Sequence, residues 1–140
     1  MAELSVVIVA IDNEQRTVMQ VLVDGTSVAR TVHSCASFPV AAADPVIRRV
    51  RSANPDVTLV DIPADNPVSA LRAIELIHQE MPDSAVFAIG SLSQPQVIVN
   101  AMRAGAREFI ERPTTTTDLL EAFVRLTAAQ RRGKQEGPRP

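Results

Sequence analysis

The chain has 140 residues, 46% of them apolar and 21% charged, so its size and composition fit a single globular domain. A formal net charge of −2 argues against a nucleic-acid-binding module, which usually carries a basic excess. No apolar run is long enough to insert into a membrane, no signal peptide is recognisable, and a single cysteine cannot form an internal disulfide, so we expect a cytoplasmic protein.

The first half of the chain predicts two strands and two helices. Val6–Ile11 is a continuous apolar, β-branched run, which is typical of a strand buried on both faces. Asp12 follows as the expected N-cap of a helix, and Val28–Ser34 alternates weakly, as a strand nearer the sheet edge does. Pro45 is expected to start a second, shorter helix.

The second half predicts three more strand–helix units, with strands at Val57–Ile62, Ala85–Ile89 and Glu108–Glu111. Each is followed by a residue that can cap a helix, and these residues are Asn66, Ser93 and Thr115. Five alternating strand–helix units indicate an α/β fold with a parallel sheet covered on both faces. We expect the domain to span residues 1–129, with residues 130–140 as a flexible polar tail or linker.

Ligands of such sheets bind at the carboxyl ends of the strands, so the residues just past each strand are the candidate site. These are Asp12 after the first strand, Asp61 at the end of the third, Gly90 and Ser91 after the fourth, and Arg112 after the fifth. Two acids, a hydroxyl and a cation would meet there, a set that could hold a divalent cation or a phosphoryl group. A salt bridge between Arg112 and Asp61 is the expected resting arrangement.

Two segments carry a resemblance to a known family. PDVTLVDI (Pro55–Ile62) resembles the strand with the phosphoacceptor aspartate in response-regulator receiver domains, and AMRAGAREFIERP (Ala101–Pro113) resembles the fourth helix, fifth strand and Lys-Pro signature of those domains. The resemblance covers residues 4–129 and implies a flavodoxin-like (βα)5 sandwich with strand order 2-1-3-4-5. Among atypical receivers, the chain is most similar to the N-terminal domain of the CpaE/TadZ pilus-assembly ATPases.

The resemblance assigns Asp61 to the phosphoacceptor position and Asp12 to the neighbourhood of the acidic pair that holds Mg²⁺. The two residues that align best with that pair are Ala10 and Ile11, so the acidic pocket is degenerate. With only Asp12 and Asp61 as metal ligands, we expect at most weak Mg²⁺ binding and no other cofactor.

The remaining positions of the receiver pattern are also altered. Arg112 stands at the invariant lysine, and the resemblance implies a cis bond between it and Pro113. Gly90 stands at the switch threonine or serine, with Ser91 beside it, and Phe109 stands at the aromatic switch position.

Three hypotheses about function follow. The first is a signalling module of a two-component or pilus-assembly system, with Asp61 as the phosphoacceptor and a histidine kinase, a downstream ATPase or pilus-assembly components as partners. The second is a pseudo-receiver that mediates protein interaction and dimerisation without phosphorylation. The third, a small nucleotide-binding protein or enzyme, ranks last because no glycine-rich loop follows the first strand, and we expect no enzymatic activity.

We also expect a homodimer formed through the fourth helix, fifth strand and fifth helix, because a short edge strand and half-covered helices favour a partner. Six residues are available on this surface: Val99, Met102, Arg103, Arg107, Glu111 and Glu121.

Overall fold

A computed structural model describes residues 3–135 of the chain as alternating strands and helices. The strands are β1 (Leu4–Val9), β2 (Ala29–Cys35), β3 (Val57–Asp61), β4 (Ala85–Gly90) and β5 (Glu108–Glu111). The helices are α1 (Asn13–Gly25), α2 (Pro45–Ala53), α3 (Pro67–Glu80), α4 (Pro95–Ala104) and α5 (Thr116–Gln135).

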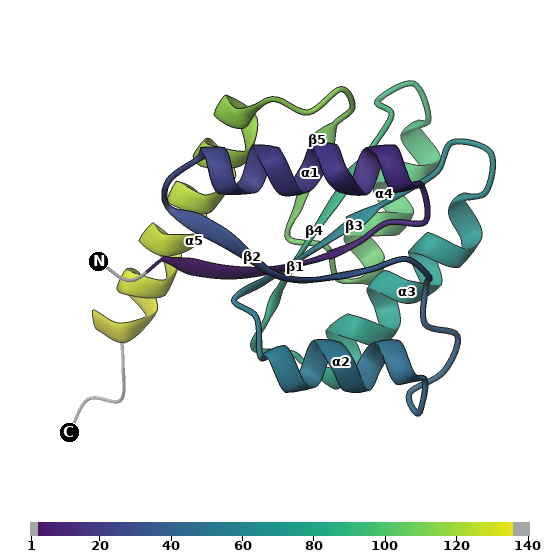
Figure 1. Cartoon of the computed structure of the whole chain (residues 1–140), viewed down its shortest axis with the longest axis horizontal. Helices are drawn as coiled ribbons and strands as arrows, with labels where there is room; N and C mark the ends of the chain where they lie inside the picture. The colour runs from purple at the N-terminus through teal and green to yellow at the C-terminus, as the bar shows by residue number, and fades with distance from the viewer. Residues whose placement is uncertain (1–2, 136–140) are drawn as a thin grey trace.

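The five strands form one parallel sheet in the order β2-β1-β3-β4-β5, which confirms the predicted flavodoxin-like topology (Figure 1). β3 lies in the middle, and all five of its residues are buried. β5 lies at one edge of the sheet, as predicted, and β2 lies at the other.

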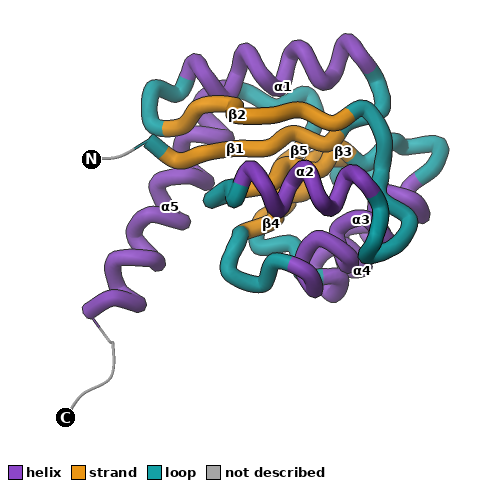
Figure 2. Tube along the Cα trace, turned by 60° about the horizontal axis from the view of Figure 1, so that its bottom comes forward, coloured by secondary structure: helices purple, strands orange, loops and turns teal. Residues whose placement is uncertain are grey.

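Side chains alternate between two cores, one on each face of the sheet. Val7 and Val9 of β1 point into the core shared with α2, α3 and α4, whereas Val6 and Ile8 point into the core shared with α1 and α5. Figure 2 shows α1 on one side of the sheet and α2, α3 and α4 on the other. Helices therefore cover both faces of the sheet, and the surfaces at the carboxyl and amino ends of its strands remain open to bind ligands or partners.

Three helices begin at the side-chain caps that their sequences favour. The carboxylate of Asp12 accepts the backbone N–H of Gln15 at 2.8 Å at the start of α1, and Asp44 caps α2. The hydroxyl of Thr115 accepts the N–H of Asp118 at 3.1 Å at the start of α5. Each bond satisfies a backbone donor that the helix itself leaves open.

The predicted caps of the other two helices make no such bond. α4 begins after Gln94 rather than at Ser93, because the Ser93 hydroxyl lies 2.6 Å from that of Ser91 and is engaged there. Asn66 precedes α3 as predicted, but its side chain forms no capping hydrogen bond. Pro67 and Pro95 occupy the first turn of these helices, where a missing N–H costs nothing.

Two boundaries also differ from the prediction. β1 ends at Val9, so Ile11 lies in the turn to α1 and is 48% exposed. α5 continues to Gln135, so residues 130–135, which the sequence predicts as the start of a polar tail, are helical; residues 136–140 lie outside the described part. The last turns of α5 extend beyond the sheet (Figure 2).

Gly105 ends α4 with a φ of +120°, a conformation that side chains rarely adopt. A Cβ atom at this position would lie 2.4 Å from the His78 ring of α3. The glycine therefore lets α4 end against α3 and turn back into β5.

The β2 edge of the sheet is irregular. The pairing with β1 shifts between Val6 and Val7, which leaves Val32 of β2 without a partner residue, as in a β-bulge. Beside it, the backbone N–H of Thr31 donates to the carboxylate of Asp24 at 2.8 Å.

Candidate functional site

The candidate site is an open hollow of about 420 Å³ at the carboxyl edge of the sheet. Three of the sequence-predicted site residues line it together: Asp61 at the end of β3, Asp12 after β1 and Arg112 after β5. The other lining residues are Ile11, Gln15, Pro63, Ala64, Asp65 and Asn66.

An ion pair between Asp61 and Arg112 crosses the inner part of the site. One guanidinium nitrogen of Arg112 lies 2.6 Å from a carboxylate oxygen of Asp61, and it also donates to the backbone carbonyl of Ile62 at 2.8 Å. The Asp61 side chain is only 4% exposed and that of Arg112 is 23% exposed. The salt bridge expected from the sequence is thus present, and it is largely shielded from water.

The backbone around Arg112 fixes where the guanidinium can reach. Its N–H donates to the carbonyl of Gly90 at 2.8 Å, which extends the pairing of β5 with β4 by one residue. The bond to Pro113 is cis, as the resemblance to receiver domains implies.

Burial raises the pKa of the Asp61 carboxyl above its usual value, because the low-dielectric interior disfavours the charged form. The hydrogen bond and the positive charge of Arg112 act in the opposite direction, and the negative charge of Asp12 adds to the rise. Asp61 is buried, whereas Asp12 and Asp65, the other two acids that line the hollow, are exposed.

The donor set around the hollow does not fit a tight Mg²⁺ site. Mg²⁺ requires octahedral oxygen coordination, but one oxygen of Asp61 is bonded to Arg112 and the exposed Asp12 carboxylate caps α1. Asp65 also lines the hollow. Within residues 3–135, no group of three or more His, Cys, Asp or Glu side chains could hold a metal ion.

The switch positions lie next to the hollow but do not line it. Ser91 is bonded to Ser93, in the loop before α4. Gly90 lies against Phe109, whose ring tip would be 2.9 Å from a Cβ atom at position 90. The half-buried Phe109 ring therefore occupies the space that a threonine or serine side chain would need.

One residue near the site was not anticipated. Arg16 of α1 donates to the carbonyl of Ala10 at 2.8 Å and also bonds the side chain of Asn13, so it holds the turn that carries Asp12. Its position in the first turns of a helix that follows a strand was the available signal. Cys35 lies apart from the site, fully buried, and burial raises the pKa of its thiol.

The sheet order, with helices on both faces of the sheet, is the fold of the CheY-like receiver domains. No family model matches the chain. The chemotaxis protein CheY of Thermotoga maritima is 24% identical over 83 residues, which are 58% of this chain and 67% of CheY.

Solved structures show the same fold in a CheY-like protein and in a protein named for pilus assembly. The CheY-like protein tadZ of Pseudomonas aeruginosa PAO1 is 22% identical with a TM-score of 0.71, and the match covers 89% of this chain and 99% of that one. A candidate pilus assembly protein (cpaE) of Burkholderia thailandensis E264 is 21% identical with a TM-score of 0.74, over 89% of this chain and 98% of that one. At these identities the likeness establishes the fold. None of the described helices is both long and apolar enough to cross a membrane.

Proposed function

We propose that the chain is a receiver-like regulatory module that acts by contacting other proteins, and that it does so without phosphorylation of Asp61. This is the second of the hypotheses drawn from the sequence. The buried ion pair between Asp61 and Arg112 is the observation that carries the proposal.

Phosphoryl transfer to an aspartate needs a free carboxylate oxygen as the nucleophile and positive charge on the transferring group. In this chain the Arg112 guanidinium is bonded to one carboxylate oxygen of Asp61, so its positive charge neutralises the carboxylate and makes the remaining oxygen a weaker nucleophile. Arginine is also bulkier than lysine and is always charged in proteins, which stabilises the ion pair with Asp61.

The likeness to the pilus assembly protein cpaE supports pilus-assembly components as the partner class. A downstream ATPase is the partner that the resemblance to the CpaE/TadZ proteins implies. The surface of α4, β5 and α5 is the proposed contact face, because Val99 and Met102 are 41% and 44% exposed there. A histidine kinase remains the partner that the first hypothesis requires.

The decisive experiment is incubation of the chain with acetyl phosphate and Mg²⁺, followed by intact mass and by NMR with beryllofluoride. We expect no added phosphoryl group and no shift of the Asp61 backbone signal, and Mg²⁺ affinity weaker than low micromolar. The matched gain-of-function variant is Ile11→Asp with Arg112→Lys, which adds an acid at an exposed position lining the hollow and removes the guanidinium.

That variant should accept a phosphoryl group, and further substitution of Asp61→Asn should abolish the reaction. A wild-type chain that gains one phosphoryl group, with loss of the signal in Asp61→Asn, would establish the first hypothesis instead.

A further inference from the structure

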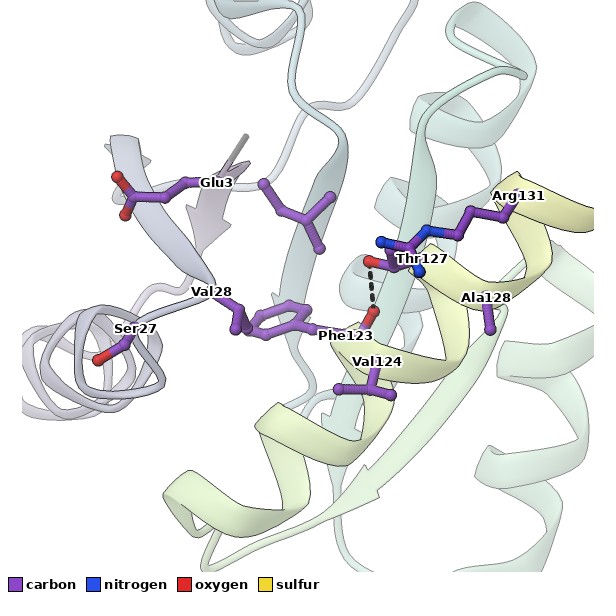
Figure 3. A pocket seen from close by; sticks show the side chains of 9 residues that line it. Glu3, Ser27, Val28, Phe123, Val124, Thr127, Ala128 and Arg131 are labelled. Carbon is purple, nitrogen blue, oxygen red and sulfur yellow. Dashed lines mark hydrogen bonds between the residues drawn. The ribbon is translucent and has the colours of Figure 1, made fainter. Parts of the chain in front are cut away.

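A second hollow, of about 350 Å³, lies at the opposite, amino edge of the sheet (Figure 3). It is formed between α5 and the beginnings of β1 and β2. Its lining residues are Glu3, Leu4, Ser27, Val28, Phe123, Val124, Thr127, Ala128 and Arg131.

The hollow exposes apolar surface that nothing in the described chain covers. Leu4, Val28 and Phe123 lie at its base, and they belong to or pack against the core on the α1–α5 face. Val124 stands at its rim and is 53% exposed, although it lies in the middle of a long helix. Exposed apolar side chains beside an apolar hollow are typical of a surface that binds another chain.

A ridge along α5 borders this hollow. It consists of Glu121, Val124, Ala128 and Arg131, whose spacings of three, four and three residues place them on one side of the helix. Two small apolar side chains form the middle of the ridge, an acid lies at one end and a base lies at the other. Two copies of the ridge packed antiparallel are therefore complementary in both shape and charge.

We propose that a second copy of this chain covers the hollow, with the two α5 helices antiparallel about a twofold axis between Val124 and Ala128. Val124 of each copy then faces Ala128 of the other, and Glu121 of each copy faces Arg131 of the other. A twofold contact uses one patch twice, so each favourable pairing occurs twice. Opposite charges flanking an apolar seam fix both the register and the direction of such helix pairs.

This surface differs from the dimer surface expected from the sequence, with which it shares only Glu121. Arg103 and Arg107, on the α4–β5 side, line two hollows whose walls are mostly charged or polar side chains. Arg125, on that side of α5, is already bonded to Glu108 through two nitrogens, at 3.1 and 2.8 Å. Self-association through the α5 ridge leaves the α4–β5 side available for other proteins, and it is independent of any chemistry at Asp61.

The test is a charge-swap experiment read by sedimentation equilibrium. Glu121→Arg alone and Arg131→Glu alone each turn two attractions into two repulsions, so each should raise the dissociation constant of the dimer at least about tenfold. Mixing these two variants restores an opposite charge at both contacts, so the mixture should form a heterodimer with near wild-type affinity. A dimer through the α4–β5 side does not predict this rescue.

Two further variants complete the test. Val124→Asp should abolish the dimer, whereas Val21→Asp, which alters an even more exposed valine on α1, should not. All positions are exposed, and unchanged thermal unfolding will show that the variants fold. A monomeric wild type at high micromolar concentration overturns the proposal. So does a dimer that dissociates with Arg103→Glu and Arg107→Glu but not with the α5 variants, or a mixture of single charge variants that fails to associate.

Discussion

Removal of the Arg112 side chain should leave the negative charge of Asp61 buried without a positive partner. In Arg112→Ala, Asp61, whose side chain is only 4% exposed in the wild type, loses its charged partner, and the carbonyl of Ile62 loses a donor. Breaking a buried pair by removing one partner costs about 3–5 kcal/mol, and we expect about 2–4 kcal/mol here because Arg112 is partly exposed and Asp61 can take up a proton. At about 3–4 °C per kcal/mol for a domain of this size, the melting temperature should fall by roughly 6–16 °C.

A double-mutant cycle separates the energetic cost of the unpaired buried charge from the cost of lost packing. Asp61→Asn keeps an acceptor near Arg112 without the buried charge, so it should cost about 1 kcal/mol or less. The double variant with Arg112→Ala should then be more stable than Arg112→Ala alone. The measurement is urea unfolding followed by circular dichroism at neutral pH. A single variant Arg112→Ala within about 0.5 kcal/mol of wild type would refute the reasoning, because a surface substitution costs no more than that.

Further predictions concern three glycines and the titration of the buried acid. Gly105→Ala should destabilise the domain by about 2–4 kcal/mol, since it combines a positive φ with a severe clash, whereas Gly133→Ala, in open space on α5, should be neutral or stabilising in the same thermal unfolding assay. Gly90→Ala should displace the Phe109 ring by a few tenths of an ångström or more, visible as shifted aromatic NMR signals without loss of the fold. Because the folded state raises the pKa of Asp61, it holds that proton to a higher pH than the unfolded state does. The free energy of unfolding should therefore lose a component as pH rises from about 3.9 to the raised pKa; pH-dependent urea unfolding should show this loss in wild type and not in Asp61→Asn.

Local sequence patterns were sufficient to predict the alternating strands and helices of a parallel α/β sheet, and the resemblance to receiver domains supplied the strand order. Runs of β-branched residues such as Val57–Asp61 have few alternatives to a buried parallel strand, and Asp12 and Thr115 cap the helices they precede. The ion pair of Asp61 with Arg112 was predictable because the carboxyl ends of parallel strands share one edge.

Features that depend on competing local choices were not predictable. Ser91, Ser93 and Gln94 offer several possible helix starts, and the hydroxyl–hydroxyl contact decides among them. The contact of Phe109 with Gly90 depends on a ring orientation that the sequence does not specify. The hollow beside α5 arises from the packing angle and length of that helix, which no local pattern encodes.

The irregular β2 edge limits how copies of this protein can meet. An open strand edge is a template for sheet extension, and repeated extension leads to fibrous aggregates. Here a bulge at Val32 breaks the regular edge, and the Asp24 carboxylate takes up the N–H of Thr31 that an added strand would need. At the opposite edge, β5 has only four residues. Open-ended polymerisation by strand addition is thereby disfavoured at both edges of the sheet. Association is directed to helix surfaces instead, where it can stop at a finite number of copies.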